Sequence, residues 1–317
     1  MSKVISQRPV SVLLVVGPTA SGKSSLALSL AQRFDAELVS ADSVQIFKQI
    51  DIGSAKPTLA ERALVAHHVI DCEEPDAFYD AARFVLDADQ AISDIVARGR
   101  RVIVVGGTGL YQRALVRGLA PGIGRAPDVR ERLHARASLG RHELTQMHAE
   151  LAAVDPEYAA KISTNDPIRI VRALEVFEIS GVPMSVHHAR HAAMPPRYRA
   201  LWLGIETDAA ALKPRVIERA RAMLSAGWID ETRAILQRYG PSIKPLTTVG
   251  YAQVLAHILS GSTDSSELLQ AIVQSTTAFA KRQRTWFRGE PDVIWDDAMA
   301  LDSSPWHARI EAFFQGQ

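Results

Sequence analysis

Residues 10–24, VSVLLVVGPTASGKS, decide the fold of this chain. Residues 10–16 are an apolar run rich in valine, which is typical of a strand buried on both faces of a parallel sheet. Residues 17–24 match the pattern G-x-x-x-x-G-K-[ST]. Its fixed positions are occupied by Gly17, Gly22, Lys23 and Ser24. Residues 23–34 then show helical periodicity, and this order of strand, glycine loop and helix predicts a phosphate-binding loop.

The loop sequence also predicts the chemistry of the site. Glycines let successive backbone N–H groups turn toward phosphate oxygens, the following helix presents its N-terminus, and Lys23 adds a positive charge. The Ser24 hydroxyl is the expected ligand of Mg²⁺, the one cofactor we expect. The expected phosphate site consists of Gly17, Pro18, Thr19, Ala20, Ser21, Gly22, Lys23 and Ser24. By motif alone this is a nucleotide-binding, ATP-type loop, so it does not say whether phosphate is transferred.

The strand and helix order predicts an α/β fold, with a P-loop NTPase-like parallel sheet flanked by helices. Residues 36–43, AELVSADS, read as a second strand, and residues 101–111, RVIVVGGTGLY, as a third with a glycine-rich exit. The helix predicted over residues 82–99 ends at Gly99, where a C-cap is expected. Two such crossovers imply a parallel sheet.

An all-helical insertion interrupts this pattern. Proline and glycine gather at residues 118–127, helical periodicity follows, and the apolar run ALWLGIE at residues 200–206 reads as a returning strand. We therefore expect a core domain of residues 1–120 and 199–317 and a helical domain of residues 121–198. After the returning strand the rest of the chain is expected to be helical.

Composition limits the function classes. Hydrophobic residues make up 47% of the 317 residues and charged residues 22%, which is ordinary for a globular protein. A net charge of +1 gives no large positive field, so binding of nucleic acid would depend on local basic clusters. The single cysteine, Cys72, excludes an internal disulfide and a multi-cysteine zinc site. An intracellular, cytoplasmic location is expected, and no apolar run is long enough for a membrane span.

Asp42 ends the second predicted strand and has two interpretations. Asp is a common N-cap, and it is also a common general base. The glycine-rich exit at Gly106 and Gly107 carries no Asp, unlike the strand that holds Mg²⁺ in most P-loop NTPases, and no Asn-Lys-x-Asp motif for guanine is present. These residues leave a small-molecule or nucleotide kinase as an open alternative.

The sequence also contains local clusters of basic residues and of histidines. One group mixes cations with aromatic side chains, as proteins that bind single-stranded nucleic acid do, although from the residues alone a solvated helix face with its aromatic rings buried beneath it is the favoured interpretation. Its members are Lys281, Arg284, Trp286, Phe287 and Arg288. Arg215 and Arg219, four residues apart, share one helix face. The group His187, His188 and His191 has no neighbouring carboxylate or thiolate to complete a metal site and is expected in a surface linker.

Together these segments resemble the tRNA dimethylallyltransferases, also called tRNA isopentenyltransferases. The resemblance rests, in order, on GPTASGKS, SADSVQIFKQIDIGSAKP, HHVID, VVGGTGLYQRAL, NDPIRIVRALEV, VGY and FAKRQRTWFRG. It implies a prenyltransferase that moves a dimethylallyl group from dimethylallyl diphosphate to N6 of the adenosine 3′-adjacent to the anticodon of tRNA. The diphosphate is then released and not transferred.

The resemblance also implies roles for individual residues. Asp42 corresponds to the general base, Thr19 and Thr108 lie near the reacting groups, and Arg215 and Arg219 are expected to clamp the diphosphate. The positions that match tRNA-contacting segments are Asp42, Ser43, Val44, Gln45, Thr108, Arg130, Ile168, Arg169, Ile170, Val171, Arg172, Gly250, Tyr251, Lys281, Arg282, Gln283 and Trp286. The helical domain is expected to grip the anticodon stem-loop, and the protein is expected to act as a monomer.

Four positions depart from the family pattern. Thr247 and Ala252 replace basic residues around the Val-Gly-Tyr triplet, which places a tRNA contact there in doubt; Phe47 replaces Tyr, and Ser54 replaces Thr. A single cysteine also excludes the zinc finger of many eukaryotic members, so the bacterial type is expected. A non-enzymatic RNA-binding protein, the second rival interpretation, leaves Asp42 without a task.

Overall fold

A computed structural model describes residues 9–120 and 126–316. The chain forms two compact units: Met1–Val116 together with Arg197–Gln317, and Arg117–Pro196. Residue 121, the expected first residue of the insertion, lies outside the described residues. Among the described residues, every helix is too short or too polar to cross a lipid bilayer.

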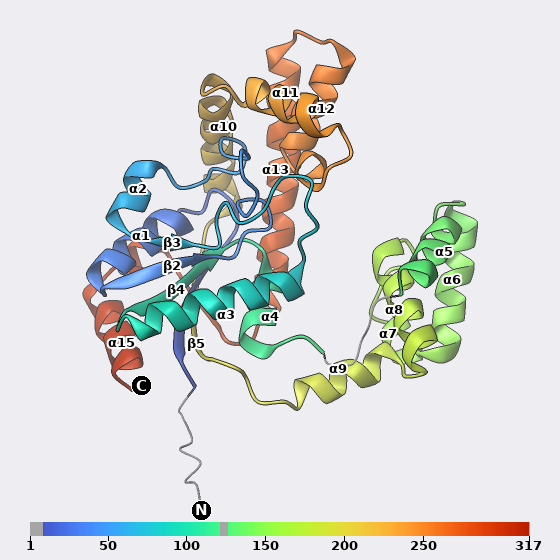
Figure 1. The fold of residues 1–317 in the computed structure, drawn as a ribbon, viewed down its shortest axis with the longest axis horizontal. Coiled ribbons are helices and arrows are strands. Elements are labelled where there is room, and N and C mark those ends of the chain that lie inside the picture. Colours follow the sequence, from blue (N-terminus) through green and yellow to red (C-terminus); the bar gives the residue numbers. More distant parts are fainter. Residues whose placement is uncertain (1–8, 121–125, 317) are drawn as a thin grey trace, which may run out of the picture. The chain divides into compact units, whose positions relative to one another are not determined.

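A parallel sheet of six strands is the centre of the first unit as far as the structure describes it (Figure 1). The strands are β1 (Ser11–Val16), β2 (Ala36–Ser40), β3 (His67–His68), β4 (Arg101–Gly106), β5 (Arg199–Ile205) and β6 (Val293–Asp296). Their order is β3-β2-β4-β1-β5-β6, and Leu14 of the central β1 pairs with Val104 of β4 and Trp202 of β5. The predicted α/β fold with a parallel, helix-flanked sheet is confirmed.

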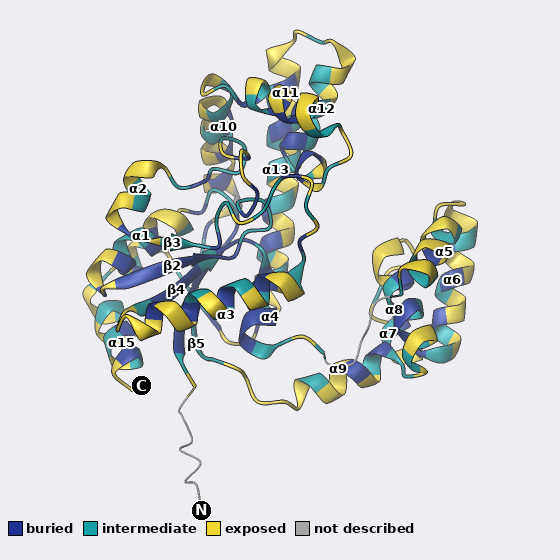
Figure 2. Cartoon of the chain, viewed as in Figure 1, coloured by how far each residue is buried: buried dark blue, intermediate teal, exposed yellow. Residues whose placement is uncertain are grey.

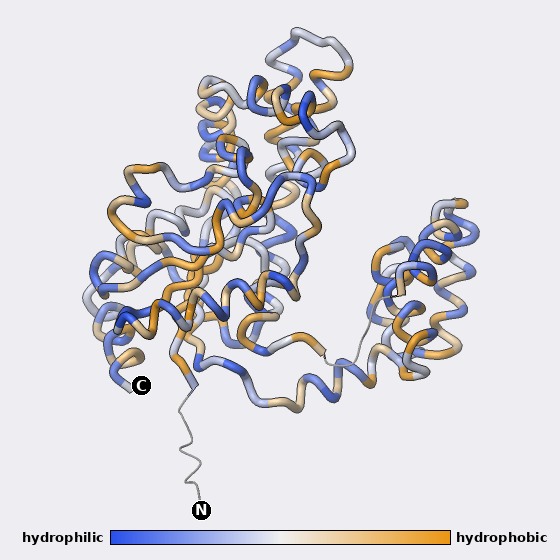
Figure 3. Tube along the Cα trace, viewed as in Figure 1, coloured by the Kyte–Doolittle hydropathy of each residue, from blue (hydrophilic) through white to orange (hydrophobic). Residues whose placement is uncertain are grey.

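Strand β1 is buried on both faces because its side chains alternate between two hydrophobic layers. Leu14 packs with α3 (Ala81–Ala97) and α4 (Gly109–Arg117), whereas Leu13 packs with α1 (Lys23–Arg33) and α15 (Ser304–Gln315). Figures 2 and 3 show the same arrangement, with buried, hydrophobic strands between amphipathic helices. The order of the strands places the ends of β1, β2 and β4 side by side.

Further helices of the first unit surround this core. They are α2 (Leu59–Leu64), α10 (Ala209–Ser225), α11 (Trp228–Tyr239), the 3₁₀ turn η1 (Lys244–Thr247), α12 (Tyr251–Ser260), α13 (Ser265–Arg288) and α14 (Ala298–Leu301). Helix α13 packs against α10. Helix α3 ends before Gly99, whose φ of 73° is the left-handed conformation that the predicted C-cap requires.

The second unit is a small helical bundle with its own core. It contains α5 (Pro127–Ala137), α6 (Arg141–Val154), α7 (Pro156–Ala159), α8 (Pro167–Ser180) and α9 (Met184–Ala192). The first part of its core is built from Leu133, Met147 and Ile170, each nearly inaccessible to solvent. Proline at the first helical position starts α5, α7 and α8, where its missing N–H costs nothing.

Two expectations about secondary structure were wrong. The segment after β5 is not wholly helical, because Val293–Asp296 forms the edge strand β6; four residues carry too little periodicity to separate a strand from a loop. The three histidines do not lie in a linker but on α9, where His187 is buried against the bundle. Its ring nitrogen Nε2 is 3.2 Å from the Ser180 hydroxyl, so a hydrogen bond explains this buried histidine.

Candidate active site

The phosphate loop joins β1 to α1 in a conformation that depends on glycine. Gly22 is the N-cap of α1 with a φ of 94°, and no side chain caps this helix end. A Cβ on Gly17 would lie 2.9 Å from the Ser21 hydroxyl, so this position also favours glycine. The loop is closed by the Ser21 N–H, which donates to the Pro18 carbonyl at 3.3 Å. The uncapped first turn of α1 is consequently a favourable place for an anion.

A cavity of ≈ 120 Å³ lies beside this loop. It brings together residues from the loop, from the end of β2, from α10 and from α13, including Thr19, Lys23, Ser24, Asp42, Gln45, Gly106, Arg219 and Gln283. Apolar side chains such as Leu28, Ile70 and Phe279 complete its wall. The cavity therefore combines the cations Lys23 and Arg219, the carboxylates Asp42 and Glu61, and an apolar surface. Arg215 is exposed and lies outside this lining, so of the two expected clamps only Arg219 is placed at the cavity.

Two cations and one carboxylate interact in this cavity. Burial lowers the pKa of the Lys23 ammonium to about 8, the nearby Arg219 acts in the same direction, and Asp42 opposes both. Burial likewise lowers the pKa of the Arg219 guanidinium, again against the attraction of Asp42. An entering anion would stabilise both cations in their charged forms, so the electrostatics of the cavity favour an anionic ligand.

Asp42 is held by the turn that follows β2. Its Oδ1 accepts the Val44 N–H at 2.9 Å and the Gln45 N–H at 3.4 Å, so it caps a turn and no regular helix. Within the described residues, its Oδ2 receives no hydrogen bond. Thr108 fastens the same turn, because its Oγ1 accepts the Ser43 N–H at 3.1 Å. One carboxylate oxygen therefore has a capping role, while the other is available to a ligand.

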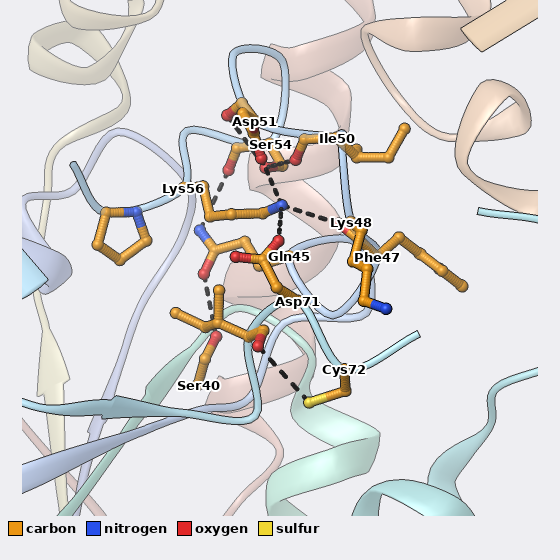
Figure 4. Close-up of polar contacts among 12 residues, drawn as sticks. Ser40, Gln45, Phe47, Lys48, Ile50, Asp51, Ser54, Lys56, Asp71 and Cys72 are labelled. Carbon is orange, nitrogen blue, oxygen red and sulfur yellow. Dashed lines mark hydrogen bonds and ion pairs between the residues drawn. The ribbon is translucent and has the colours of Figure 1, made fainter. Parts of the chain in front are cut away.

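Within the segment of residues 45–57, the cavity is lined by Gln45, Ser54, Ala55 and Pro57. Hydrogen bonds of Gln45 and Lys56 hold this segment, the cavity wall, in place (Figure 4). The Gln45 amide accepts the Ser40 hydroxyl at 3.0 Å and donates to the Ala55 carbonyl at 3.1 Å. The Lys56 ammonium, with a side chain only 2% exposed, donates to Asp51 and Asp71 at 2.6 Å and to the Phe47 carbonyl at 2.8 Å. This role of Lys56 is not visible in the sequence, because Asp71 comes next to its ammonium only in the folded chain.

The same wall is fastened to α11 by Glu231. Its carboxylate accepts the backbone N–H groups of Asp51 at 2.9 Å, Ile52 at 2.7 Å and Gly53 at 3.2 Å. It also accepts the Tyr251 hydroxyl at 2.6 Å. Tyr251 is buried, and a Cβ on the neighbouring Gly250 would lie 2.5 Å from the Trp228 ring. The expected tRNA contact by the Tyr251 side chain is therefore contradicted, since burial and Glu231 occupy it; only its backbone remains for such a contact.

The predicted tRNA-contacting residues of α13 divide into two sets. Lys281 and Arg282 are exposed. Trp286 is half-buried, with the Arg113 guanidinium 3.6 Å from its ring centroid. Gln283 is buried and lines the cavity, and both ends of its amide form hydrogen bonds with backbone groups, so its side chain has a structural role apart from the proposed tRNA contact.

The predicted residues of the second unit also divide. Ile170 and Val171 lie in its core, so the expectation that their side chains contact tRNA was wrong. Arg130 and Arg172 both donate to the buried Glu175 at 2.7 Å and keep about a third of their side chains exposed. Ile168 and Arg169, near the start of α8, are exposed. A single carboxylate thus orders two of the three predicted arginines.

Comparison with known proteins identifies the family. The family model described as IPP transferase matches residues 45–290, and the model described as isopentenyl transferase matches residues 10–71. The tRNA dimethylallyltransferase of Sorangium cellulosum is 47% identical over 89% of each chain, and that of Anaeromyxobacter dehalogenans is 45% identical over 90% of this chain and 94% of its own.

Solved structures agree with this assignment. The full-length tRNA isopentenylpyrophosphate transferase of Bacillus halodurans superposes with a TM-score of 0.70 at 30% identity over 98% of both chains. A eukaryotic dimethylallyltransferase acting on tRNA gives a TM-score of 0.78 at 25% identity over 95% of this chain and 78% of its own. The chain therefore belongs to the IPP transferase family, whose members include the tRNA dimethylallyltransferases.

Proposed function

We propose that this chain transfers a dimethylallyl group from dimethylallyl diphosphate to N6 of the adenosine 3′-adjacent to the anticodon of tRNA, and releases diphosphate. One observation supports this above all. A phosphate loop and a carboxylate with a free oxygen line the same cavity, where prenyl transfer needs a site for the leaving group next to a base. The relatives are named as dimethylallyltransferases that act on tRNA, which supports prenyl transfer to tRNA as the reaction.

The diphosphate departs from an allylic carbon, so the reaction depends on neutralising the leaving group. Lys23, Arg219 and the open N–H groups of α1 would surround it with positive charge, which is worth most in a partly buried cavity. Arg215 remains a proposed clamp that would have to act from outside the cavity lining. Because the cations already lie at the cavity, little reorganisation is needed as negative charge develops.

The residues at the loop fit a magnesium ion carried by the diphosphate. Ser24 and Asp42 both line the cavity, and within the described residues no cluster of three or more His, Cys, Asp or Glu side chains forms a metal cage. Mg²⁺ commonly binds through few protein oxygens together with substrate phosphates and water, which matches this donor set. Bound there by the Ser24 hydroxyl, it would supply further charge neutralisation to the leaving group.

Asp42 is suited to removing a proton from the attacking amine. The exocyclic N6 of adenine is a weak nucleophile that must lose a proton as it bonds to carbon. Asp42 is held through Oδ1 by the turn, which leaves Oδ2 to accept that proton. Thr19 lines the cavity beside it, and Thr108 supports the turn.

The exposed basic residues of both units are the proposed tRNA surface. The anticodon loop is single-stranded, so the target adenine can leave its stack at reduced cost. Arg169, Lys281 and Arg282 are exposed and can reach phosphates, while Arg130 and Arg172 are ordered by Glu175. We propose that the helical unit grips the anticodon stem-loop and that the enzyme acts as a cytoplasmic monomer.

A transfer assay with purified protein tests the proposal. Dimethylallyl diphosphate and a tRNA transcript with adenosine beside the anticodon should give a prenylated tRNA and one diphosphate per transfer. A transcript with guanosine at that position is the matched control and should give none. Consumption of ATP with phosphorylation of an acceptor, and no prenylated tRNA, would overturn the proposal in favour of the kinase.

A further inference from the structure

Gln283 joins the phosphate loop to the segment that follows β4. Its Oε1 accepts the backbone N–H of Thr19 at 2.8 Å, and its Nε2 donates to the Gly107 carbonyl at 2.9 Å. The residue is 6% exposed and is 264 positions away from Thr19 in the sequence. Both ends of one buried amide are therefore used to hold two loops at a fixed separation.

The backbone after β4 is shaped to admit this side chain. A Cβ on Gly107 would lie 2.1 Å from Gln283 Nε2, and a Cβ on Gly106 would lie 2.2 Å from the Ala41 carbonyl oxygen. No other residue type fits either position without displacing these groups. The Gly-Gly pair stands where most P-loop NTPases have an acidic residue. Glycine is needed here because α13 packs closely against Gly107, and the turn carrying Asp42 packs closely against Gly106.

These contacts continue to the proposed base. From Gly107 the chain passes to Thr108, whose N–H donates to Ala41 at 3.2 Å and whose Oγ1 accepts the Ser43 N–H at 3.1 Å. Ala41 and Ser43 are the two neighbours of Asp42. These hydrogen bonds, together with the peptide link from Gly107 to Thr108, therefore connect the loop that would hold the donor to the turn that holds Asp42.

We propose that Gln283 is a positioning residue that fixes the phosphate loop relative to Asp42. The proposal rests on the proposed function and deepens it, since the distance between leaving group and base decides the rate of transfer. By accepting the Thr19 N–H, Gln283 removes that donor from the set available to phosphate and sets the direction of the loop. In this role Gln283 acts through its hydrogen bonds to Thr19 and Gly107.

Gln112 offers a matched control for the variant Gln283→Met. Gln112 is fully buried, and its Nε2 donates to the neighbouring Gly106 carbonyl at 3.0 Å, while its Oε1 has no hydrogen-bond partner. Gln112→Met therefore removes a buried side-chain hydrogen bond to the end of β4 and leaves the contacts of the phosphate loop unchanged. Gln283→Met removes two hydrogen bonds and Gln112→Met removes one, so the melting temperature should fall more in Gln283→Met. Both variants are therefore assayed well below their melting temperatures, where a difference in function reports the contacts of Gln283 with the two loops.

The test has two readouts, of which one does not need turnover. Single-turnover transfer with saturating donor and tRNA should fall between about tenfold and 100-fold in Gln283→Met, because misplacement of reacting groups costs this much. Affinity for inorganic diphosphate, measured by calorimetry, should fall about tenfold in the same variant. Gln112→Met should stay within about twofold of the parent protein in both, and tRNA affinity should be unchanged in both variants.

Gln283→Glu provides a second test if Gln283→Met does not fold. It keeps an acceptor for Thr19 but places a carboxylate against the Gly107 carbonyl and beside the anion site, so transfer and diphosphate affinity should both fall while tRNA affinity is unchanged. Equal losses in the Gln283 and Gln112 variants, or a loss confined to tRNA affinity, would overturn the positioning role. A parent protein that binds diphosphate but transfers no prenyl group would instead refute the proposed function. The calorimetric comparison of the variants would still test whether Gln283 positions the phosphate loop.

Discussion

Binding of the diphosphate donor should be coupled to uptake of a proton by Lys23. Burial and the neighbouring Arg219 lower the pKa of this ammonium to about 8 in the free protein. Diphosphate places negative charge beside Lys23, which raises its pKa again and favours the protonated form. Above pH 8 the free protein holds mostly neutral Lys23, so the donor binds well only after a proton has been taken up.

The magnitude follows from the fraction of neutral Lys23. With a pKa of about 8, that fraction is about 0.1 at pH 7, about 0.5 at pH 8 and about 0.9 at pH 9. These values are also the expected number of protons taken up per donor bound. Apparent affinity scales with the protonated fraction, so it should be about tenfold weaker at pH 9 than at pH 7. The sign is fixed: affinity decreases as the pH rises through the pKa of Lys23 in the free protein.

Calorimetry in buffers of different ionisation enthalpy measures this proton uptake directly. Dimethylallyl diphosphate is titrated without tRNA, so that no turnover occurs. At pH 8 and above the ligand is almost fully ionised, as expected of phosphate groups whose last pKa is about 6, so proton uptake measured there belongs to the protein. Lys23→Arg is the control, because arginine stays protonated throughout this range. A donor affinity that does not change between pH 7 and pH 9, or equal proton uptake by Lys23→Arg, would refute the reasoning.

Three further perturbations test other parts of the site. Asp42→Asn keeps an acceptor for the turn, so the melting temperature should hold while the single-turnover rate falls by roughly 10²- to 10⁴-fold; an unchanged rate would remove Asp42 as the base. Arg169→Ala and Arg282→Ala should weaken tRNA binding and reduce the slope of log affinity against log salt by about one each, with donor affinity as the control. Glu231→Gln leaves the amides of residues 51–53 with a weaker acceptor and should lower the free energy of unfolding by about 1–3 kcal/mol in urea titrations. A change below the error of the titration would show that this carboxylate does not hold the cavity wall.

The sequence was most informative where a pattern is local. The run at residues 10–16 predicts a doubly buried strand because apolar residues occupy both faces, and β1 has Leu13 and Leu14 in opposite hydrophobic layers. The loop motif predicts its own conformation, since Gly22 is needed for a positive φ. The helical character of the block after residue 127 was predicted from its periodicity, and the structure describes helices α5, α6 and α8 there.

Residue roles that depend on distant partners could not be predicted in this way. Tyr251 and Gln283 lie in segments whose sequence suggests RNA contact, yet Glu231 and Thr19 occupy their polar groups. The sequence around Lys56 does not show that its ammonium is buried between the carboxylates of Asp51 and Asp71. Asp42 was open to two interpretations, and the structure shows that its two oxygens differ.

The sequence by itself thus determined the phosphate loop, the parallel sheet, the helical block that follows it and the family resemblance, because backbone conformation and hydrophobic periodicity are encoded over a few residues. Only the tertiary structure decided that Arg219 lines the cavity and Arg215 does not, although both lie on one helix. It also decided that Gln283 bonds to the loop and not to solvent. Burial and hydrogen-bond pairing are properties of whichever groups the chain brings together, and residues 19 and 283 become neighbours only when α13 packs against the ends of β1 and β4.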